Sequence, residues 1–361
     1  MKEARKLICE NGREFVGTGF GSRRDAVCEL VFNTSMVGYQ EILSDLSYAG
    51  QAVCMTYPLI GNYGLADEDY ETKSPQVGAL IVREHNDAPS NYRYTKTLAE
   101  EMEEYGIPGL AGIDTRALTR MLRDAGPMRG LLCDATVTAE EGVRRIAETP
   151  VPHDLVARVS CKKPWYSRTA NYRFTVAALD CGIRRSTIEA LHTLGCNLVV
   201  LPHNASCDAV RAVRPDGLLV AGGPGDPNDA QSVCGTLAAL AGELPLLGVG
   251  LGCALAAMAL GAQSERLPHP HHGANHTVKC ADGVTLITGQ SHSYGLTLDS
   301  LRARGLAVTH THSLDGTAEG FACAEKCVRG VLYHPSADDA VFTRFLEDME
   351  AAACEGGVKH A

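Results

Sequence analysis

The stretch Pro245–Leu260, PLLGVGLGCALAAMAL, decides the fold class. A short apolar strand, Pro245–Val249, runs through a glycine-rich turn into an apolar helix, Cys253–Leu260. Short apolar runs bounded by Gly and Pro are typical of parallel strands buried on both faces, which bind ligands beyond their carboxyl ends. The second half is therefore predicted to be a doubly wound α/β domain. Its other expected elements are the strands Phe174–Leu179, Asn197–Leu201 and Asp216–Val220 and the helix Ser186–Leu194.

The amino-terminal part is instead rich in short β-type runs. Ala26–Asn33 and Gln51–Tyr57 are predicted strands, and Asp114–Asp124 is a predicted helix with Asp114 at its N-cap. Between Thr149 and Arg173 the apolar periodicity lapses into prolines and polar residues, as in a domain linker. We expect a mainly β or α+β domain at residues 1–150, a linker at 151–172 and the α/β domain at 173–361.

Composition excludes several classes of function. The 361 residues carry 33 Lys and Arg against 43 Asp and Glu, a net charge of −10, which disfavours nucleic-acid binding. No apolar run reaches the roughly 20 residues of a membrane span, and Met1–Glu10 lacks a signal-peptide core, so a cytoplasmic protein without membrane contact is expected. The 14 cysteines are scattered through a long chain and are expected to be free thiols.

Two glycine-rich turns follow predicted strands. In Gly222–Pro227 the glycines permit close approach of a ligand to backbone N–H groups, although a plain turn explains the local pattern equally well. Gly248–Cys253, hereafter the elbow, has the spacing of a nucleophile elbow, in which a residue between strand and helix presents its side chain above the sheet. The apex residue is Gly250, which has no atom that could attack a carbonyl.

Histidines supply the other candidate groups. His334 follows a predicted strand, Gly330–Leu332, and could act as a general base, but the residue two positions later is Ser336 rather than a carboxylate. A second group of histidines lacks a carboxylate or Cys at ligand spacing, so hydrogen-bonded structural roles are expected and no metal site is predicted. These are His269, His271, His272 and His276.

With these motifs, the chain resembles the small subunit of carbamoyl-phosphate synthetase, whose carboxyl-terminal half is a class I glutamine amidotransferase domain. The resemblance covers nearly the whole chain. In the first half it rests on Val31–Asp45, Ser47–Tyr48, Tyr57–Pro58, Ile60–Gly64 and Gly112–Arg120. In the second half it rests on Gly223–Pro227, His271–Gly273, Asn275–His276 and Gln290–Tyr294.

The resemblance implies an activity and a partner. In the family the small subunit hydrolyses glutamine, and the ammonia passes through a tunnel to a large subunit. That subunit uses ATP and bicarbonate to make carbamoyl phosphate for arginine and pyrimidine synthesis. A heteromer with a large subunit is therefore implied, with ATP and Mg²⁺ expected only on that partner and no cofactor in this chain.

Carried over by position, part of the family's glutamine site is present and part is replaced. Ser47, Gly223, Gly225 and Leu251 agree with the family, and the Gln290–Tyr294 segment adds Ser293 and Tyr294. The family elbow reads Gly-Ile/Val-Cys-Leu-Gly-His-Gln. The replaced positions are Gly250 for the nucleophilic Cys, Cys253 for His, Ala254 for a substrate-holding Gln, Ser291 for a substrate-binding Asn, and Ser336 for the Glu that orients His334.

Three functions remain open from the sequence. The first is a structural or regulatory subunit, a pseudoenzyme without glutaminase activity that supports the use of free ammonia. The second is an active glutaminase with a relocated nucleophile such as Cys253. The third is a sensor that binds glutamine without turnover. Because Ala254 and Ser291 remove polar contacts, glutamine binding is expected to be weak or absent.

Overall fold

The computed structural model describes residues 3–358, and the chain forms two units. The first unit runs to Pro152 and includes 268–273, and the second holds the remaining residues from His153 onward. The segment expected as a linker, 151–172, contains α5 (Leu155–Val159) and β10 (Trp165–Ser167). Because β10 pairs with a strand of the second unit, most of this segment belongs to that unit.

The first unit is built on a closed barrel with the strand order β1-β2-β8-β6-β4-β3-β9. The predicted strand Ala26–Asn33 is present as β3, and Asp114 caps α3 by accepting a hydrogen bond of 2.9 Å from the Ala117 amide. The remaining elements are β1 (Ala4–Cys9), β2 (Glu14–Gly21), α1 (Tyr39–Ser44), η1 (Leu46–Tyr48), β4 (Gln51–Met55), β5 (Leu59–Ile60), η2 (Asp67–Asp69), β6 (Ala79–Val82), β7 (Glu84–His85), α2 (Leu98–Glu104), β8 (Pro108–Ala111), α3 (Thr115–Ala125), β9 (Met128–Asp134) and α4 (Ala139–Glu148).

The second unit is built on one mixed sheet with the order β10-β12-β11-β13-β14-β19-β18-β16-β15-β17. Strands β12, β11, β13, β14 and β19 are parallel neighbours, as predicted for a doubly wound domain. The elements are β11 (Phe174–Asp180), α6 (Arg185–Thr193), β12 (Cys196–Pro202), α7 (Cys207–Val213), β13 (Gly217–Val220), η3 (Pro227–Ala230), α8 (Gln231–Leu240), β14 (Leu246–Val249), α9 (Leu251–Ala259), β15 (Ser264–Cys280), β16 (Thr285–Leu296), α10 (Leu298–Ala303), β17 (Ala307–His312), β18 (Ala318–Cys323), η4 (Ala324–Lys326), β19 (Val328–Val331) and α11 (Ala340–Val358).

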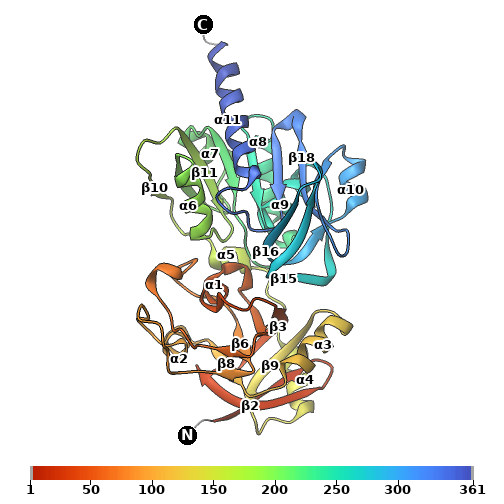
Figure 1. Cartoon of the computed structure of the whole chain (residues 1–361). Coiled ribbons are helices and arrows are strands. Elements are labelled where there is room, and N and C mark those ends of the chain that lie inside the picture. The colour runs from red at the N-terminus through yellow and green to blue at the C-terminus, as the bar shows by residue number, and fades with distance from the viewer. Residues whose placement is uncertain (1–2, 359–361) are drawn as a thin grey trace. The chain divides into compact units, whose positions relative to one another are not determined.

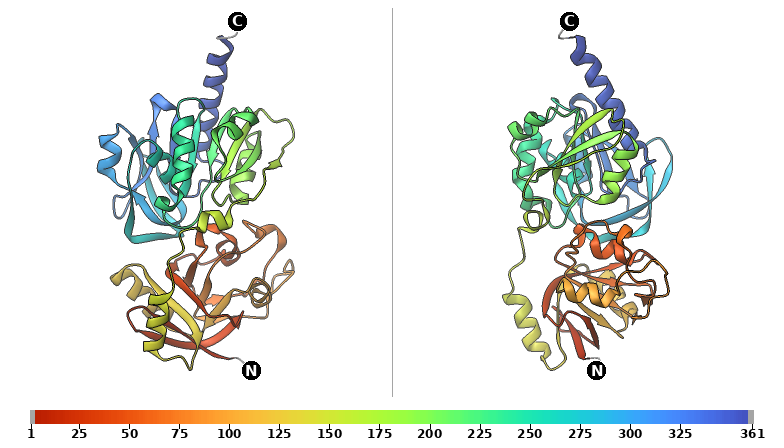
Figure 2. Two further views of the ribbon diagram at one scale, coloured as in Figure 1. Left: turned by 180° about the vertical axis from the view of Figure 1, so that it is seen from behind. Right: turned by 90° about the vertical axis from the view of Figure 1, so that its left-hand side faces the viewer.

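The parallel strands are buried on both faces by two apolar clusters. Along β11, Ala177 and Leu179 pack into the cluster that contains α8 and α9, while Val176 and Ala178 pack into the cluster with α6 and α11. Helices accordingly lie on both sides of this sheet (Figures 1 and 2). This two-sided burial explains why the strands read as continuous apolar runs in the sequence.

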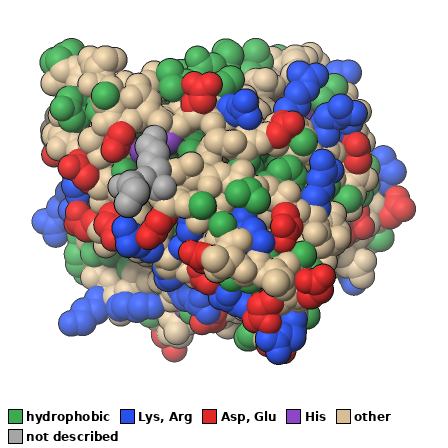
Figure 3. Space-filling model, turned by 90° about the horizontal axis from the view of Figure 1, so that it is seen from below, with side chains coloured by type: hydrophobic (Ala, Val, Ile, Leu, Met, Phe, Trp, Pro, Cys, Tyr) green, Lys and Arg blue, Asp and Glu red, His purple; other side chains and the backbone are tan. Residues whose placement is uncertain are grey.

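Charged side chains are mixed on the face of the molecule drawn in Figure 3, where Lys and Arg alternate with Asp and Glu without forming a patch of one sign. None of the helices in residues 3–358 has the length and apolar character needed to cross a membrane. All 14 cysteines fall within the described residues and are free thiols, as predicted from their scattered positions.

Candidate active site

Three loops of the second unit meet at one edge of its sheet. The turn after β13 holds Gly222–Pro227, the elbow follows β14, and His334 lies beyond the end of β19. Because β13, β14 and β19 are parallel neighbours, their carboxyl ends lie side by side. The motifs singled out in the second half of the sequence are therefore assembled by the strand order.

The backbone of the elbow is held in an unusual conformation at Gly250, with φ 57° and ψ −124°. Its N–H donates to the Val331 carbonyl at 2.8 Å, and its carbonyl accepts from the Cys253 amide at 2.9 Å. A Cβ placed on Gly250 would lie 3.4 Å from the Gly222 Cα and 3.9 Å from the Leu332 oxygen. The turn thus keeps room for a side chain that the residue does not supply.

Gly252 is required by close packing of α9 on the sheet, and this gives a first stability prediction. A Cβ at Gly252 would lie 2.1 Å from the Val220 carbonyl oxygen, so Gly252→Ala forces one backbone segment to move. We expect it to lower the free energy of unfolding by about 3 kcal/mol or more. Urea unfolding followed by circular dichroism measures the change.

The matched control is Gly235→Ala on α8. A Cβ added at Gly235 would have no atom within 4 Å, and the residue lies inside a helix, so alanine there is expected to stabilise by about 0.5–1 kcal/mol. Equal effects of the two substitutions would contradict the packing account of the elbow.

Gly223 and Leu251 lie next to each other at the base of the site. A Cβ on Gly223 would be 2.0 Å from the Cys181 carbonyl oxygen and 3.2 Å from Leu251 Cδ2, so only glycine permits this approach. Gly225 has φ +86°, a conformation that favours glycine. Ser47 belongs to the first unit, where it is buried in η1 and its amide donates to the Asp45 carboxylate at 2.9 Å.

His334 is held against β16 and contacts Ser291. Its amide donates to the Gly289 carbonyl at 2.9 Å, and its Nε2 lies 2.6 Å from the Ser291 hydroxyl oxygen. Ser336, in contrast, is exposed, and its hydroxyl donates to Asp338 at 2.7 Å. That bond lowers the pKa of the Asp338 carboxyl. The hydroxyl at position 336 is thus engaged by a neighbouring carboxylate.

Cys253 and Ala254 point into the protein core. Their exposed fractions are 0% and 1%, and both belong to the apolar cluster around α9. Burial, followed by the nearby Glu319 carboxylate, raises the pKa of the Cys253 thiol well above its ordinary value. The thiol therefore stays protonated at neutral pH and faces away from solvent.

Two ionisable residues near the elbow were missed in the sequence. Glu319 in β18 is fully buried, and its Oε2 lies 3.6 Å from Nε2 of His292, which lies on β16 between Ser291 and Ser293. The sequence signal for Glu319 was its position between Ala318 and Gly320 in an apolar run, where a carboxylate is unusual. Ser293 is buried and Tyr294 is half-buried on the same strand as His292.

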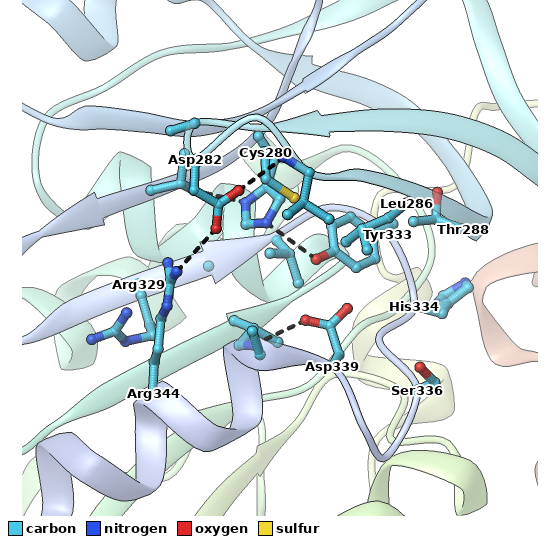
Figure 4. Close-up of a pocket in the computed structure, with 18 of the residues that line it drawn as sticks. Cys280, Asp282, Leu286, Thr288, Arg329, Tyr333, His334, Ser336, Asp339 and Arg344 are labelled. Atoms are coloured by element: carbon cyan, nitrogen blue, oxygen red, sulfur yellow. Dashed lines mark hydrogen bonds and ion pairs between the residues drawn. The ribbon is translucent and has the colours of Figure 1, made fainter.

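A cavity of about 430 Å³ lies beside the loop that carries His334 and Ser336 (Figure 4). Tyr333 and Asp339 project into it, and the Tyr333 hydroxyl lies 3.4 Å from His310 Nε2. Burial lowers the pKa of His310 and raises that of Tyr333, so both groups are neutral near pH 7. Arg344 faces Asp282 across 3.6 Å at the opposite end.

Members of the histidine group make hydrogen bonds or ring contacts within their own units. His276 Nδ1 lies 3.0 Å from His312 Nε2, whose Nδ1 lies 3.0 Å from the Asp315 carboxylate. In the first unit, His272 packs its ring 5.4 Å from that of Tyr48. His272 and His276 are thus each in contact with another ring.

Comparisons with known proteins agree with this architecture. Residues 7–132 match the family "Carbamoyl-phosphate synthase small chain, CPSase domain", and residues 177–349 match "Glutamine amidotransferase class-I". The chain belongs to the carbamoyl-phosphate synthase small chain family. This confirms the resemblance inferred from the sequence, and the two matched regions fall in the first and second units respectively.

Curated members of the carbamoyl-phosphate synthase small chain family match along nearly their whole length. A pyrimidine-specific small chain from Halalkalibacterium halodurans is 42% identical over 354 residues, which cover 96% of this chain and 97% of the relative. The small chain of Bacillus caldolyticus is 42% identical, covering 99% and 100%. The pyrimidine-specific small chain of Bacillus subtilis is 40% identical, covering 98% of each.

Proposed function

We propose that this chain is a small subunit of carbamoyl-phosphate synthase that has lost its own glutamine hydrolysis and acts as a structural or regulatory subunit. The observation that carries the proposal is the elbow, where the backbone turn and the space for a side chain persist at Gly250 without a nucleophile. Covalent catalysis at this position needs a thiolate, and loss of the nucleophile costs several orders of magnitude in rate.

The residues at the other replaced positions also disfavour glutamine hydrolysis. Ser336 supplies no carboxylate to orient His334 and is hydrogen-bonded to Asp338 instead. Ala254 has no polar group for a substrate amide, and the short Ser291 side chain is engaged with His334. Nucleophile, orienting group and substrate contacts are thus changed together in a fold that is otherwise that of the family.

The alternative of an active glutaminase that uses Cys253 is disfavoured by burial. A nucleophilic thiol must be accessible and must ionise near neutral pH. Cys253 is fully buried, and its pKa is raised by that burial. Access to substrate would require α9 to leave its apolar cluster.

The proposed partner is a large synthetase chain that uses ATP, Mg²⁺, bicarbonate and free ammonia. The names of the relatives as small chains support a heteromer, and two of them are called pyrimidine-specific, which favours pyrimidine synthesis over arginine synthesis as the product's destination. On this proposal the small chain contributes contacts to the large chain rather than ammonia.

Glutamate release from glutamine tests the proposal directly. The purified chain is expected to show no release above the uncatalysed background, whereas a family member with Cys at the elbow apex hydrolyses glutamine. Cys253→Ser is expected to change nothing. A rate near that of the Cys-containing member would overturn the proposal, and a rate abolished by Cys253→Ser would establish the alternative.

Isothermal titration with glutamine separates a structural subunit from a sensor. Since Ala254 and Ser291 leave few polar contacts, we expect a Kd weaker than about 1 mM, less than about 4 kcal/mol of binding free energy. Saturable binding well below that concentration, without glutamate release, would contradict the structural role and favour a ligand-sensing subunit.

A further inference from the structure

The contact between Ser291 and His334 joins a hydroxyl to an imidazole in the candidate active site. The two residues are 43 positions apart, and the Ser291 Oγ lies 2.6 Å from His334 Nε2. A nucleophile and a base within about 2.6–3.2 Å have the spacing that hydroxyl activation requires. We propose that Ser291 and His334 form a serine–histidine dyad that hydrolyses esters of short carboxylic acids.

Local structure holds both partners in place. Ser291 is 9% exposed on β16, and the His334 amide bonds to the Gly289 carbonyl at 2.9 Å on the same strand. Backbone pairing therefore limits the relative movement of hydroxyl and ring. In the neutral tautomer with the proton on Nδ1, the Ser291 hydroxyl donates to Nε2, which is the direction of proton transfer needed for attack.

Space for a small acyl group is present at the elbow apex and in the cavity that His334 lines. A side chain is missing at the elbow apex, where the nearest atom to a Cβ position on Gly250 is 3.4 Å away. His334 also lines the cavity of about 430 Å³ shown in Figure 4. The apolar lining of this cavity includes Leu286, Val331 and Val341. An apolar wall beside the base favours a short aliphatic acyl group.

Ester hydrolysis by this dyad needs no cofactor. The Ser291 oxygen bonds to the ester carbonyl carbon as His334 Nε2 takes the hydroxyl proton, and the carbon–oxygen bond to the alcohol then breaks. His334 returns the proton to the departing alcohol. Water attacks the acyl-serine in the same way, releasing the carboxylic acid and restoring both side chains.

The dyad goes beyond the proposed function and does not restore glutaminase activity. Glutamine hydrolysis requires the nitrogen to be protonated as it leaves, because an amide anion is a much poorer leaving group than an alkoxide, and position 336 carries no carboxylate to stabilise the imidazolium that would deliver this proton. The dyad is therefore expected to hydrolyse esters but not the side-chain amide of glutamine. Failure of ester chemistry would leave the predicted loss of glutaminase standing.

A fluorophosphonate probe tests the dyad in the full-length chain. We expect covalent labelling at Ser291, identified by mass spectrometry of the proteolytic peptide, together with slow hydrolysis of p-nitrophenyl acetate. Ser291→Ala should remove both. His334→Ala should lower the labelling rate by about 100-fold, and added imidazole should restore part of it if His334 acts as the base.

Controls separate catalysis from structure. Ser232→Ala changes an exposed hydroxyl on α8 and is expected to leave labelling and ester hydrolysis unchanged. Circular dichroism checks that the Ser291 and His334 variants stay folded. Absence of a Ser291 adduct on the folded protein, or equal labelling in His334→Ala, would overturn the proposal.

Discussion

Replacing Gly250 with Cys, Ser291 with Asn and Ser336 with Glu in one chain is expected to raise the rate of glutamine hydrolysis by at least about 10³-fold. The elbow has the room, because a Cβ on Gly250 meets nothing closer than 3.4 Å. At φ 57° a side chain costs about 1–3 kcal/mol of backbone strain, which a stable fold tolerates. Glutamate release against glutamine concentration measures the gain.

Thiol reactivity shows whether the restored site has formed. Burial raises the pKa of the native Cys28 and Cys54 thiols to about 12, so these groups are protonated at pH 7 and react slowly with iodoacetamide. The thiol introduced at position 250 should be alkylated faster than these. The control is Gly250→Ala with the same two partner substitutions, which carries the strain without the sulfur. Fast alkylation with no glutamate release would contradict the account.

In a complex with a large synthetase chain, ammonium is expected to support carbamoyl phosphate formation at least about 100-fold better than glutamine at equal concentration. The physical reason is the missing covalent step at the elbow, which leaves glutamine nitrogen bound as an amide. Coupled detection of carbamoyl phosphate at fixed ATP and bicarbonate measures the ratio.

The control for this ratio is a complex with a small chain that retains the nucleophile. The same large chain with a small chain that carries Cys at the elbow apex should use both nitrogen donors. The Ser291→Ala variant of the present chain should behave like the unmodified chain with ammonium, because the proposed dyad has no part in that reaction. Equal use of glutamine and ammonium by the unmodified complex would refute the loss of glutaminase activity.

Local patterns predicted the second unit well because its parallel strands are short, apolar and bounded by glycine or proline. β11 and β14 appear within a residue of the expected bounds, whereas α9 begins at Leu251 rather than Cys253. The long strands β15 and β16, which pair with each other, were not predicted, because β15 is polar and rich in histidine and neither strand reads as a short apolar run. The segment expected as a linker contains β10, which pairs with the distant strand β12, and this pairing could not be read from local sequence.

In the candidate site, too, the sequence shows which groups are present, whereas the contacts between them depend on the fold. The order of amino acids alone settles which atoms are present, so the missing sulfur at Gly250 and the missing carboxylate at Ser336 could be recognised from the sequence. Contacts between distant segments depend on how strands are placed in the sheet. Only the tertiary structure therefore shows that the Ser291 hydroxyl contacts His334 and that the Ser336 hydroxyl donates to Asp338. It also shows that Cys253 is buried in the core near Glu319.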